Sequence, residues 1–239
     1  MPRQPNYRES FSRNYPTLSK RQQEKIRRAR VAVVGLGGLG GAAFETLVRL
    51  GFENLLVLDC DSVEESNLNR QRLSSLRSMG VKKAKAAAIL AKSINPSCNV
   101  RSIHGKIEGK NAPIVAAWAD IVLDCLDNPS SRRALHLACE KEGAPCVFGS
   151  ASGAYGMASV FSKKGFAKAF SRILPAKMPE GCTGDGWKCA SVIATAPNVI
   201  GTLQAQLALN ALLKKPVPRA PQFLIFDGFS PMIFRLVRI

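Results

Sequence analysis

The chain has 239 residues, of which 46% are hydrophobic and 21% are charged, a composition typical of a globular protein with a sizeable core. No uncharged apolar run reaches the roughly 18 residues that a membrane-spanning helix needs. The first 30 residues are polar and basic and contain no apolar run of the kind found in secretory signals. We therefore expect a cytoplasmic protein without a membrane partner.

Basic residues outnumber acidic ones: 34 Lys and Arg face 17 Asp and Glu, which gives a formal charge of +17. Such an excess favours polyanions, meaning nucleotides, nucleic acid or an acidic protein. The basic residues are spread along the chain, however, without an arginine-rich tail and without interleaved aromatic residues. Nucleic acid is therefore a less favoured partner, and a solvated basic surface is the simpler interpretation.

The cysteine pattern argues against structural metal. Seven cysteines are present, and none of them form a CxxC pair. A structural zinc site uses cysteines that are paired closely in sequence, so we expect no zinc. In a cytoplasmic chain such thiols are expected to be free and mostly buried.

The first elements alternate between helix and strand. Residues 21–30 predict a helix at the end of a basic arm, with Ser19 as its N-cap. Residues 31–34 are a short apolar run that ends in glycines, the pattern of a buried parallel strand. A helix over 40–50 and a second buried strand over 55–58 follow.

The same alternation continues to about residue 150. Strands that alternate with helices at this rhythm predict an α/β fold, namely a Rossmann-like, doubly wound, mostly parallel sheet with helices on both faces. The further helices are expected over 82–94, 113–118 and 130–142, and the further strands over 99–104, 121–124 and 146–148.

The pattern changes after residue 150. Residues 154–161 predict a strand of a different kind, and 162–190 are rich in Lys, Gly and Pro, which predicts a mobile crossover segment. An amphipathic helix over 200–213 follows, and its apolar stripe is expected to pack in the core. A hairpin of 222–227 and 233–238 then forms a C-terminal antiparallel extension.

A glycine motif joins the first predicted strand to the next helix. Gly35, Gly37 and Gly40 match GxGxxG, with Gly38 between them. The glycines let the backbone approach a phosphate, and the helix N-terminus offers unpaired N–H groups. Asp59 ends the next strand, where such folds place a carboxylate against a ribose hydroxyl. By itself this motif indicates NAD or FAD first. Because no proline-rich linker separates the later elements, we expect 31–239 to form one nucleotide-binding domain behind the arm of residues 1–30.

A polar cluster after the second strand favours a triphosphate over a dinucleotide. Dinucleotide oxidoreductases need no such cluster, whereas arginine and amide donors neutralise and orient phosphate oxygens. Lys83, at the start of the next predicted helix, adds an ammonium to a helix N-terminus. The members of the cluster are Asp61, Ser66, Asn67, Leu68, Asn69, Arg70 and Gln71.

A second acidic group lies at the end of the strand over 121–124. Asp124, Asp127 and Asn128 follow one another there, and carboxylates at such a place suit Mg²⁺, which prefers oxygen ligands and phosphates. Both carboxylates are candidate metal ligands at this point.

Taken in order, these motifs resemble the ThiF/MoeB/HesA family of adenylyltransferases, relatives of the ubiquitin-activating enzymes. GxGGLG, DxDxVxxSNLNRQ, GxxKA, INP, DCxDN and VIGxLQAxxAL follow one another as in that family, over roughly residues 11–239. The resemblance implies that ATP and a carboxylate react to an acyl-adenylate and pyrophosphate. The carboxylate is commonly the C-terminal glycine of a ubiquitin-like sulfur-carrier protein of the ThiS or MoaD type, for thiamine, molybdopterin or related cofactor synthesis. It also implies a homodimer, with a sulfurtransferase or cysteine desulfurase as a further candidate partner.

The resemblance assigns the nucleotide contacts. Gly38 lies against the nucleotide, and Asp59 holds the ribose. Asn67, Arg70 and Lys83 contact the phosphates, although Lys83 could also be an ordinary surface lysine. Because the attacking carboxylate and the α-phosphate are both anionic, catalysis would rest on charge neutralisation and in-line positioning.

Further implied roles concern the metal and the remaining catalytic residues. Asp127 binds magnesium, with Asn128 beside it, whereas Asp124 is more simply explained as a structural residue. Arg13 matches an arginine that reaches the γ-phosphate from a partner subunit; a solvated arm residue is the alternative. Cys189, or its neighbour Cys182, matches a cysteine that becomes covalently modified in relatives, although a cysteine there could be incidental. The zinc-binding CxxC pairs of many relatives are absent.

Several functional alternatives remain open at this point. Within the same superfamily, a tRNA threonylcarbamoyladenosine dehydratase shares an N-x-NRQ motif and would use the basic surface on tRNA. Adenylylation of a small-molecule carboxylate is another. An NAD(P) oxidoreductase and an inactive binding protein are disfavoured by the filled polar cluster. Finally, the uncharged stretch 149–156 could form a narrow channel for a Gly-Gly carrier tail, a hypothesis that bulky residues at Ala154 or Ala158 would test.

Overall fold

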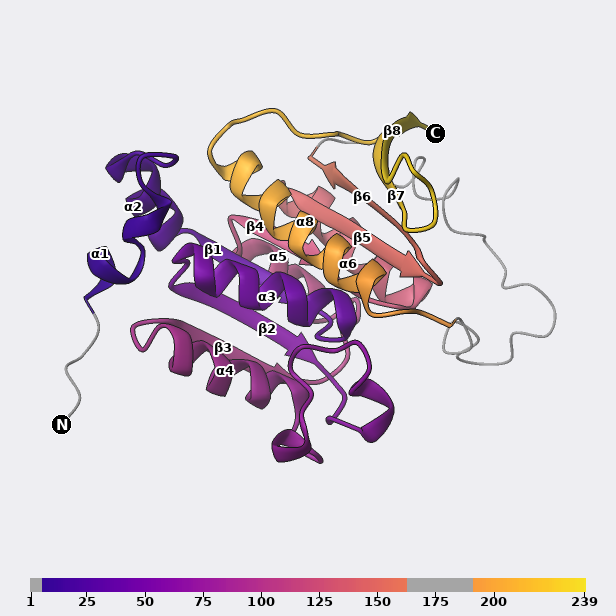
Figure 1. Cartoon of the computed structure of the whole chain (residues 1–239), viewed down its shortest axis with the longest axis horizontal. Helices are drawn as coiled ribbons and strands as arrows, with labels where there is room; N and C mark the ends of the chain where they lie inside the picture. Colours follow the sequence, from indigo (N-terminus) through magenta and orange to yellow (C-terminus); the bar gives the residue numbers. More distant parts are fainter. Residues whose placement is uncertain (1–5, 163–190) are drawn as a thin grey trace.

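An eight-stranded mixed sheet forms the centre of the chain, in a computed structural model that describes residues 6–162 and 191–239. The strands lie in the order β3-β2-β1-β4-β5-β6-β7-β8 (Figure 1). The parallel strands are β1 (Arg30–Val34), β2 (Asn54–Asp59), β3 (Asn99–His104), β4 (Ile121–Asp124) and β5 (Cys146–Ser152). The antiparallel strands are β6 (Tyr155–Phe161), β7 (Gln222–Asp227) and β8 (Phe234–Arg238). The predicted Rossmann-like fold with its antiparallel C-terminal extension is confirmed.

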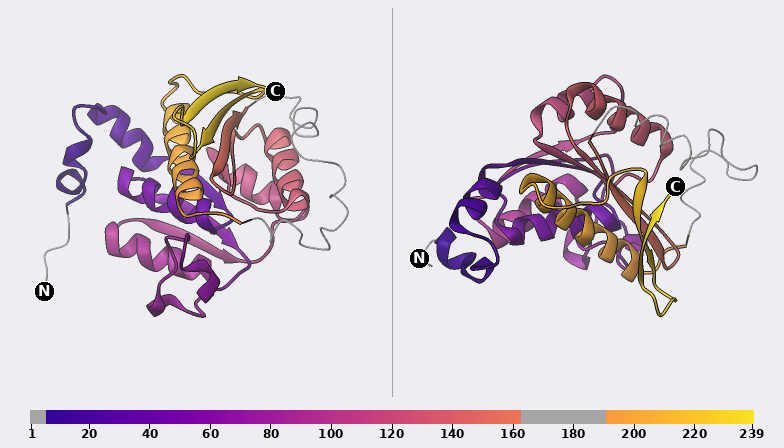
Figure 2. Two further views of the ribbon diagram at one scale, coloured as in Figure 1. Left: turned by 45° about the vertical axis from the view of Figure 1, so that its right-hand side comes forward. Right: turned by 90° about the horizontal axis from the view of Figure 1, so that it is seen from above.

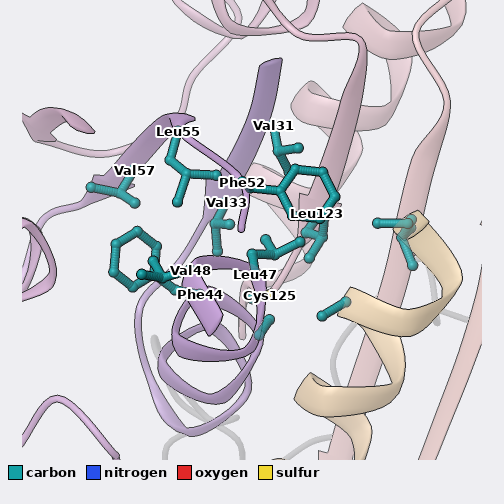
Figure 3. Close-up of a cluster of buried hydrophobic side chains, with 14 of the residues drawn as sticks. Val31, Val33, Phe44, Leu47, Val48, Phe52, Leu55, Val57, Leu123 and Cys125 are labelled. Atoms are coloured by element: carbon teal, nitrogen blue, oxygen red, sulfur yellow. The ribbon is translucent and has the colours of Figure 1, made fainter. Parts of the chain in front are cut away.

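Helices cover both faces of the parallel part of the sheet (Figures 1 and 2). Side chains alternate between the faces along each strand. Accordingly, Val31 and Val33 of β1 pack with Phe44 and Leu47 on one face (Figure 3), whereas Ala32 and Val34 belong to the core on the other. The first face carries α3 (Gly38–Leu50), α4 (Lys83–Ile94) and α8 (Thr195–Leu212), and the second carries α5 (Ala112–Trp118) and α6 (Pro129–Glu142).

Helices α3 and α8 lie side by side, close enough to require glycine at their contact (Figure 1). A Cβ atom added to Gly201 of α8 would lie 2.2 Å from the carbonyl oxygen of Leu39. The contact thus ties α8 to the first turn of α3, within the glycine motif. The apolar stripe of α8 packs in the core as predicted, with Leu207 and Ala208 buried.

The N-terminal arm contains α1 (Tyr7–Ser10), a 3-10 turn η1 (Ser12–Asn14) and α2 (Lys20–Arg28). Ser19 caps α2 and forms a reciprocal capping box with Gln22, as the sequence predicts. The arm is held at the C-terminal end of α3, where the hydroxyl of Tyr7 donates to the carbonyl of Gly51 at 2.8 Å. Gln23 Nε2 donates to the carbonyl of Leu50 at 2.9 Å. The arm therefore lies at the end of α3 that is opposite to the glycine motif.

Two boundaries differ from the prediction by more than two residues. Helix α8 begins at Thr195 rather than at residue 200. Pro197 is tolerated in its first turn because proline lacks only the backbone N–H, which has no intrahelical acceptor at that position. Strand β5 extends to Ser152 rather than ending at 148, because its last residues pair with β6 through a tight turn at Gly153. The predicted crossover segment falls almost wholly on residues 163–190, outside the described part of the chain, as do Cys182 and Cys189. No described helix is both long and apolar enough to cross a bilayer.

Candidate nucleotide site

The candidate site lies where the carboxyl ends of three parallel strands meet. Val34, the last residue of β1, is paired with Leu58 near the end of β2 and with Asp124 at the end of β4. The strand order reverses at β1, since the chain proceeds outward to β2 and β3 and then returns to β4 on the other side. Doubly wound sheets bind their ligands in the crevice at such a point.

The glycine motif is shaped by contact with the loop after β4. Gly35 has a φ of +88°, and a Cβ atom there would lie 2.6 Å from the carbonyl oxygen of Cys125. The next amide, Leu36 N, donates to Asp59 Oδ2 at 2.6 Å, and Asp61 N donates to Asp59 Oδ1 at 2.7 Å. Burial raises the pKa of the Asp59 carboxyl, against the lowering effect of these bonds. Asp59 therefore holds the glycine loop in place through Leu36 N, and it holds the start of the following loop through Asp61 N.

The polar cluster after β2 folds over the start of α3. Asn67 is buried and holds its own turn together, since its Oδ1 accepts from Glu64 N at 3.1 Å. Gln71 is buried as well, and its Nε2 lies 3.9 Å from the position of a Cβ on Gly37. Its Oε1 has no hydrogen-bond partner among the described residues. A buried carbonyl oxygen beside the glycine loop is an acceptor available to a ligand.

The two basic residues of the cluster are held differently. Arg70 is half-buried, and its Nη1 donates to the Ser66 carbonyl and to Asn69 Oδ1, both at 2.8 Å. Its remaining N–H groups are available for a phosphate. Lys83 is buried, with its Nζ 3.0 Å from Asp61 Oδ2, so the alternative of an ordinary surface lysine is wrong. The other predicted members of the cluster, Ser66, Leu68 and Asn69, are exposed.

The loop after β4 separates its two carboxylates. Asp124 is fully buried, 2.8 Å from Arg132 Nη1 and 2.7 Å from His136 Nε2. Burial acts to raise the pKa of Asp124, but Arg132 and His136 outweigh it and lower the pKa. Asp124 is thus occupied within the fold, as its structural interpretation predicts. Asp127 is exposed, and Asn128 Oδ1 caps α6 by accepting from Ser131 N at 2.9 Å.

This arrangement fits a magnesium ion held mainly by phosphates. Mg²⁺ in nucleotide sites usually takes one or two protein carboxylates, with phosphate oxygens and water as its other ligands. Asp127 is free to serve as that carboxylate, because none of its atoms is needed for capping α6. A second group of atoms that could bind a metal comes from Asp59, Cys60 and Asp61, whose ligand atoms lie within 4.8 Å of one another. Two of these residues are already engaged, since Asp59 binds Leu36 N and Asp61 pairs with Lys83.

The N-terminal turn of α8 closes the site from the side, which the sequence did not predict. A Cβ atom on Gly38 would lie 2.9 Å from Pro197 Cβ. Asn198 Nδ2 donates to the carbonyl of Arg70 at 3.3 Å, and Arg72 Nε donates to Asn198 Oδ1 at 2.6 Å. The sequence signal for this turn is the pair Pro197-Asn198, directly ahead of the VIGxLQAxxAL motif, because proline is favoured in the first turn of a helix. The predicted helix began only at residue 200.

A family model described as the ThiF family matches residues 11–239. The chain belongs to the ThiF family. It is 36% identical over 220 residues to an adenylyltransferase and sulfurtransferase MOCS3 of Drosophila virilis, covering 91% of this chain and 48% of that protein. It is 33% identical over 210 residues to a molybdopterin-synthase adenylyltransferase of Haemophilus influenzae, covering 87% of this chain and 84% of that protein. The chain thus spans about half the length of the MOCS3 relatives.

Solved structures share the fold of this ThiF-family chain. The E. coli tRNA N6-threonylcarbamoyladenosine dehydratase TcdA, in complex with AMP, superposes with a TM-score of 0.73 at 20% identity, covering 87% of this chain and 95% of that one. E. coli MccB, with AMPCPP and MccA, gives a TM-score of 0.76 at 19% identity, covering 100% of this chain and 73% of that one. At these identities the likeness establishes the fold.

Arg13 does not lie at the site of its own chain. It is exposed in η1, within the arm that packs at the far end of α3. Because α3 has 13 residues, its ends are about 20 Å apart. In this ThiF-family chain Arg13 therefore lies away from the candidate nucleotide site of its own chain, and its role at the γ-phosphate stays a prediction of the resemblance.

The proposed carrier channel over 149–156 is not left open on the side of α8. A Cβ atom on Gly149 would lie 2.3 Å from the side chain of Gln204, and one on Gly156 would lie 2.3 Å from that of Ile200. Small residues here let α8 pack against β5 and β6. Ala154 and Ala158 are buried in the same way, so bulky residues at these positions would test folding rather than carrier binding.

Proposed function

We propose that the chain is an ATP-dependent adenylyltransferase whose substrate is the C-terminal carboxylate of a ubiquitin-like sulfur-carrier protein. A carboxylate oxygen attacks the α-phosphorus of ATP, the bond from that phosphorus to the β-phosphate bridging oxygen breaks, and pyrophosphate leaves with the electron pair. The products are the carrier acyl-adenylate and pyrophosphate. The observation that carries this proposal is a set of polar groups around the glycine loop of a ThiF-family chain: Gln71 lies beside Gly37, Asp59 binds Leu36 N, and Lys83 pairs with Asp61.

The site residues supply binding and orientation. The amides of the glycine loop and the N-terminus of α3 bind phosphate oxygens. Arg70 and Lys83 neutralise charge that accumulates as pyrophosphate departs. Asp127 holds Mg²⁺, which would neutralise the phosphates when bound. The carboxylate nucleophile is already anionic, so no side chain is needed to remove a proton from it.

The carrier is proposed from the relatives. Both the MOCS3 proteins and the Haemophilus influenzae enzyme are named as adenylyltransferases, the latter for molybdopterin synthase. The charge of +17 suits an acidic partner. A homodimer, a sulfurtransferase partner and a covalent role for Cys189 belong to the same proposal. ThiS-type and MoaD-type carriers are both candidates.

Carrier-dependent exchange of labelled pyrophosphate into ATP tests the proposal. We expect exchange with a ThiS-type or MoaD-type carrier and Mg²⁺, and none with a carrier that lacks its terminal glycine. Asp127→Asn should abolish exchange while leaving the thermal unfolding curve unchanged, because Asp127 is exposed. ATP binding without exchange in the presence of either carrier type would refute carrier adenylylation.

A tRNA-modifying dehydratase is the second candidate. Two observations favour it: the chain covers 95% of TcdA at a TM-score of 0.73, and its net charge is strongly positive. The same experiment separates the candidates, because a dehydratase would consume ATP only with threonylcarbamoylated tRNA. ATP consumption with that tRNA, and none with a carrier, would establish the second candidate.

A further inference from the structure

Leu126 is held at both of its backbone polar groups, its N–H and its carbonyl, by buried charged side chains. Leu126 N donates to Asp124 Oδ1 at 3.1 Å, and the carbonyl oxygen of Leu126 accepts from Arg132 Nη2. Asp124 and Arg132 are themselves paired, with 2.8 Å between Oδ2 and Nη1. Both side chains are almost wholly buried. Together they close a ring of hydrogen bonds around one residue of the loop after β4. We call this arrangement of Asp124, Arg132 and Leu126 the clamp.

The guanidinium of Arg132 has further contacts that fix its plane. Arg132 Nη2 also donates to the carbonyl of Gly149 on β5 at 2.8 Å. Its Cζ lies 4.7 Å from the ring centroid of Phe148, a cation–π geometry. Gln204 of α8 donates from its Nε2 to the carbonyl of Asp124 on β4 at 2.8 Å and to that of Val147 on β5 at 3.0 Å. The clamp is therefore anchored to β5 and to α8.

Leu126 is the point at which the clamp meets the candidate nucleotide site. A Cβ atom on Gly35 would lie 3.1 Å from Leu126 N, so this peptide abuts the glycine loop. The next residue is Asp127. A rotation of the Leu126 peptide would therefore move the carboxylate of Asp127 relative to the phosphate end of the glycine loop.

The burial of the Asp124–Arg132 ion pair needs an explanation other than stability. Two charges taken out of water gain little over apolar side chains of similar volume. The planar fork of arginine, by contrast, binds a carboxylate and two carbonyl oxygens in a fixed plane, whereas the three donors of a lysine ammonium rotate and fix no plane. Orienting a peptide is a task that uses this geometry.

We infer that Arg132, acting with Asp124 through the Leu126 peptide, is a positioning residue for Asp127. This inference rests on the proposed function, in which Asp127 holds Mg²⁺ beside the ATP phosphates. Arg132 itself touches neither the metal nor the nucleotide. It sets the orientation in which the Asp127 carboxylate is presented.

Arg132→Lys tests the inference, because lysine keeps the positive charge beside Asp124 and loses the fork. In the protein without ligands, amide hydrogen exchange over 125–128 should be faster than in the wild type. The Mg²⁺ concentration that gives half-maximal pyrophosphate exchange should rise by about tenfold or more, the usual cost of losing a residue that orients a metal ligand. High Mg²⁺ should restore most of the rate.

Leu135→Val is the matched control. Leu135 lies on the same helix, α6, and is fully buried in the core on that face, so the substitution lowers stability without touching the clamp. The control should leave both the local hydrogen exchange and the Mg²⁺ half-saturation unchanged. Equal shifts in the control, or wild-type values in a folded Arg132→Lys protein, would overturn the inference.

A double variant covers the case in which Arg132→Lys does not fold. Asp124→Asn with Arg132→Gln removes both charges, so neither is left buried without a partner, and we expect the same two shifts. If the wild type shows no exchange with any carrier, the proposed function fails. The hydrogen-exchange comparison still reports on the clamp in that case, since faster exchange supports it and unchanged exchange contradicts it.

Discussion

Lys83 is a buried lysine whose carboxylate partner is open to solvent. Its side chain is 6% exposed, whereas that of Asp61, 3.0 Å away, is 60% exposed. An exposed carboxylate keeps its hydration when it loses its partner, so the pair contributes little to stability. In the proposed function, the buried ammonium of Lys83 binds a phosphate of ATP.

Lys83→Met should therefore lower pyrophosphate exchange without unfolding the protein. We expect a loss of about 100-fold or more, as for other fixed donors that stabilise developing negative charge. Lys82→Met is the matched control, because Lys82 is exposed and precedes α4; its rate should stay near that of the wild type. Equal losses in both variants would mean that total charge, and not Lys83, matters.

His136 makes the stability of the fold sensitive to pH. Burial lowers the pKa of its imidazole, although Asp124 acts in the opposite direction. In the unfolded chain the imidazole takes up a proton near pH 6.5, and in the fold it does so only at lower pH. The unfolded state therefore binds more protons below about pH 7, and stability falls as the pH is lowered.

His136→Gln should reduce this pH dependence. The melting temperature of the wild type is expected to fall between about pH 7.5 and pH 5.5, since the unfolded imidazole titrates in that range. The variant has no imidazole at this position, and its melting temperature should change less over the same range. Differential scanning calorimetry at several pH values measures both slopes; parallel slopes would show that other groups are responsible.

Among the elements, helix α8 joins the core to the site. Its middle packs on α3 through Gly201, and its first turn packs on Gly38 through Pro197. A change in how α8 packs should therefore affect both stability and nucleotide binding.

Gly201→Ala is expected to force these helices apart. The added methyl group would meet the carbonyl oxygen of Leu39, and overpacking of this kind costs about 1–3 kcal/mol. ATP binding should weaken as well, because Leu39 lies within the glycine motif. Chemical denaturation and calorimetric ATP titration measure the two effects. Thr202→Ala, at an exposed neighbouring position, should change neither.

Local patterns predicted the elements better than the contacts between them. The strands over 99–104 and 121–124 were predicted to the residue, because short apolar or branched runs between breakers specify a strand locally. The start of α8 lies five residues before the predicted one, because the apolar periodicity that predicts the helix begins only after its first turn. Arg132 was missed because its partner carbonyl, Gly149, lies on β5 and comes near only through the pairing of β4 with β5. The burial of Lys83 likewise depends on the tertiary fold.

At the scale of the whole molecule, the two ends of α3 divide the chain into separate functional regions. The candidate nucleotide site lies at the N-terminal end of α3, and the arm with Arg13 lies at the C-terminal end. A second copy of the chain would have to bring its own Arg13 to the site. Closed twofold symmetry would then supply one such arginine to each site.

Mixing two inactive variants tests this arrangement. Arg13→Ala and Asp127→Ala should each lack activity alone. In a mixed dimer, the site on the Arg13→Ala subunit has an intact Asp127 and receives Arg13 from its partner, whereas the other site is inactive. Random reassociation of equal amounts should therefore restore roughly a quarter of the wild-type rate. If Arg13 acted on its own chain, every site in the mixture would lack one residue and no activity would return. Light scattering on the mixture provides the control, since the restored rate requires the dimer.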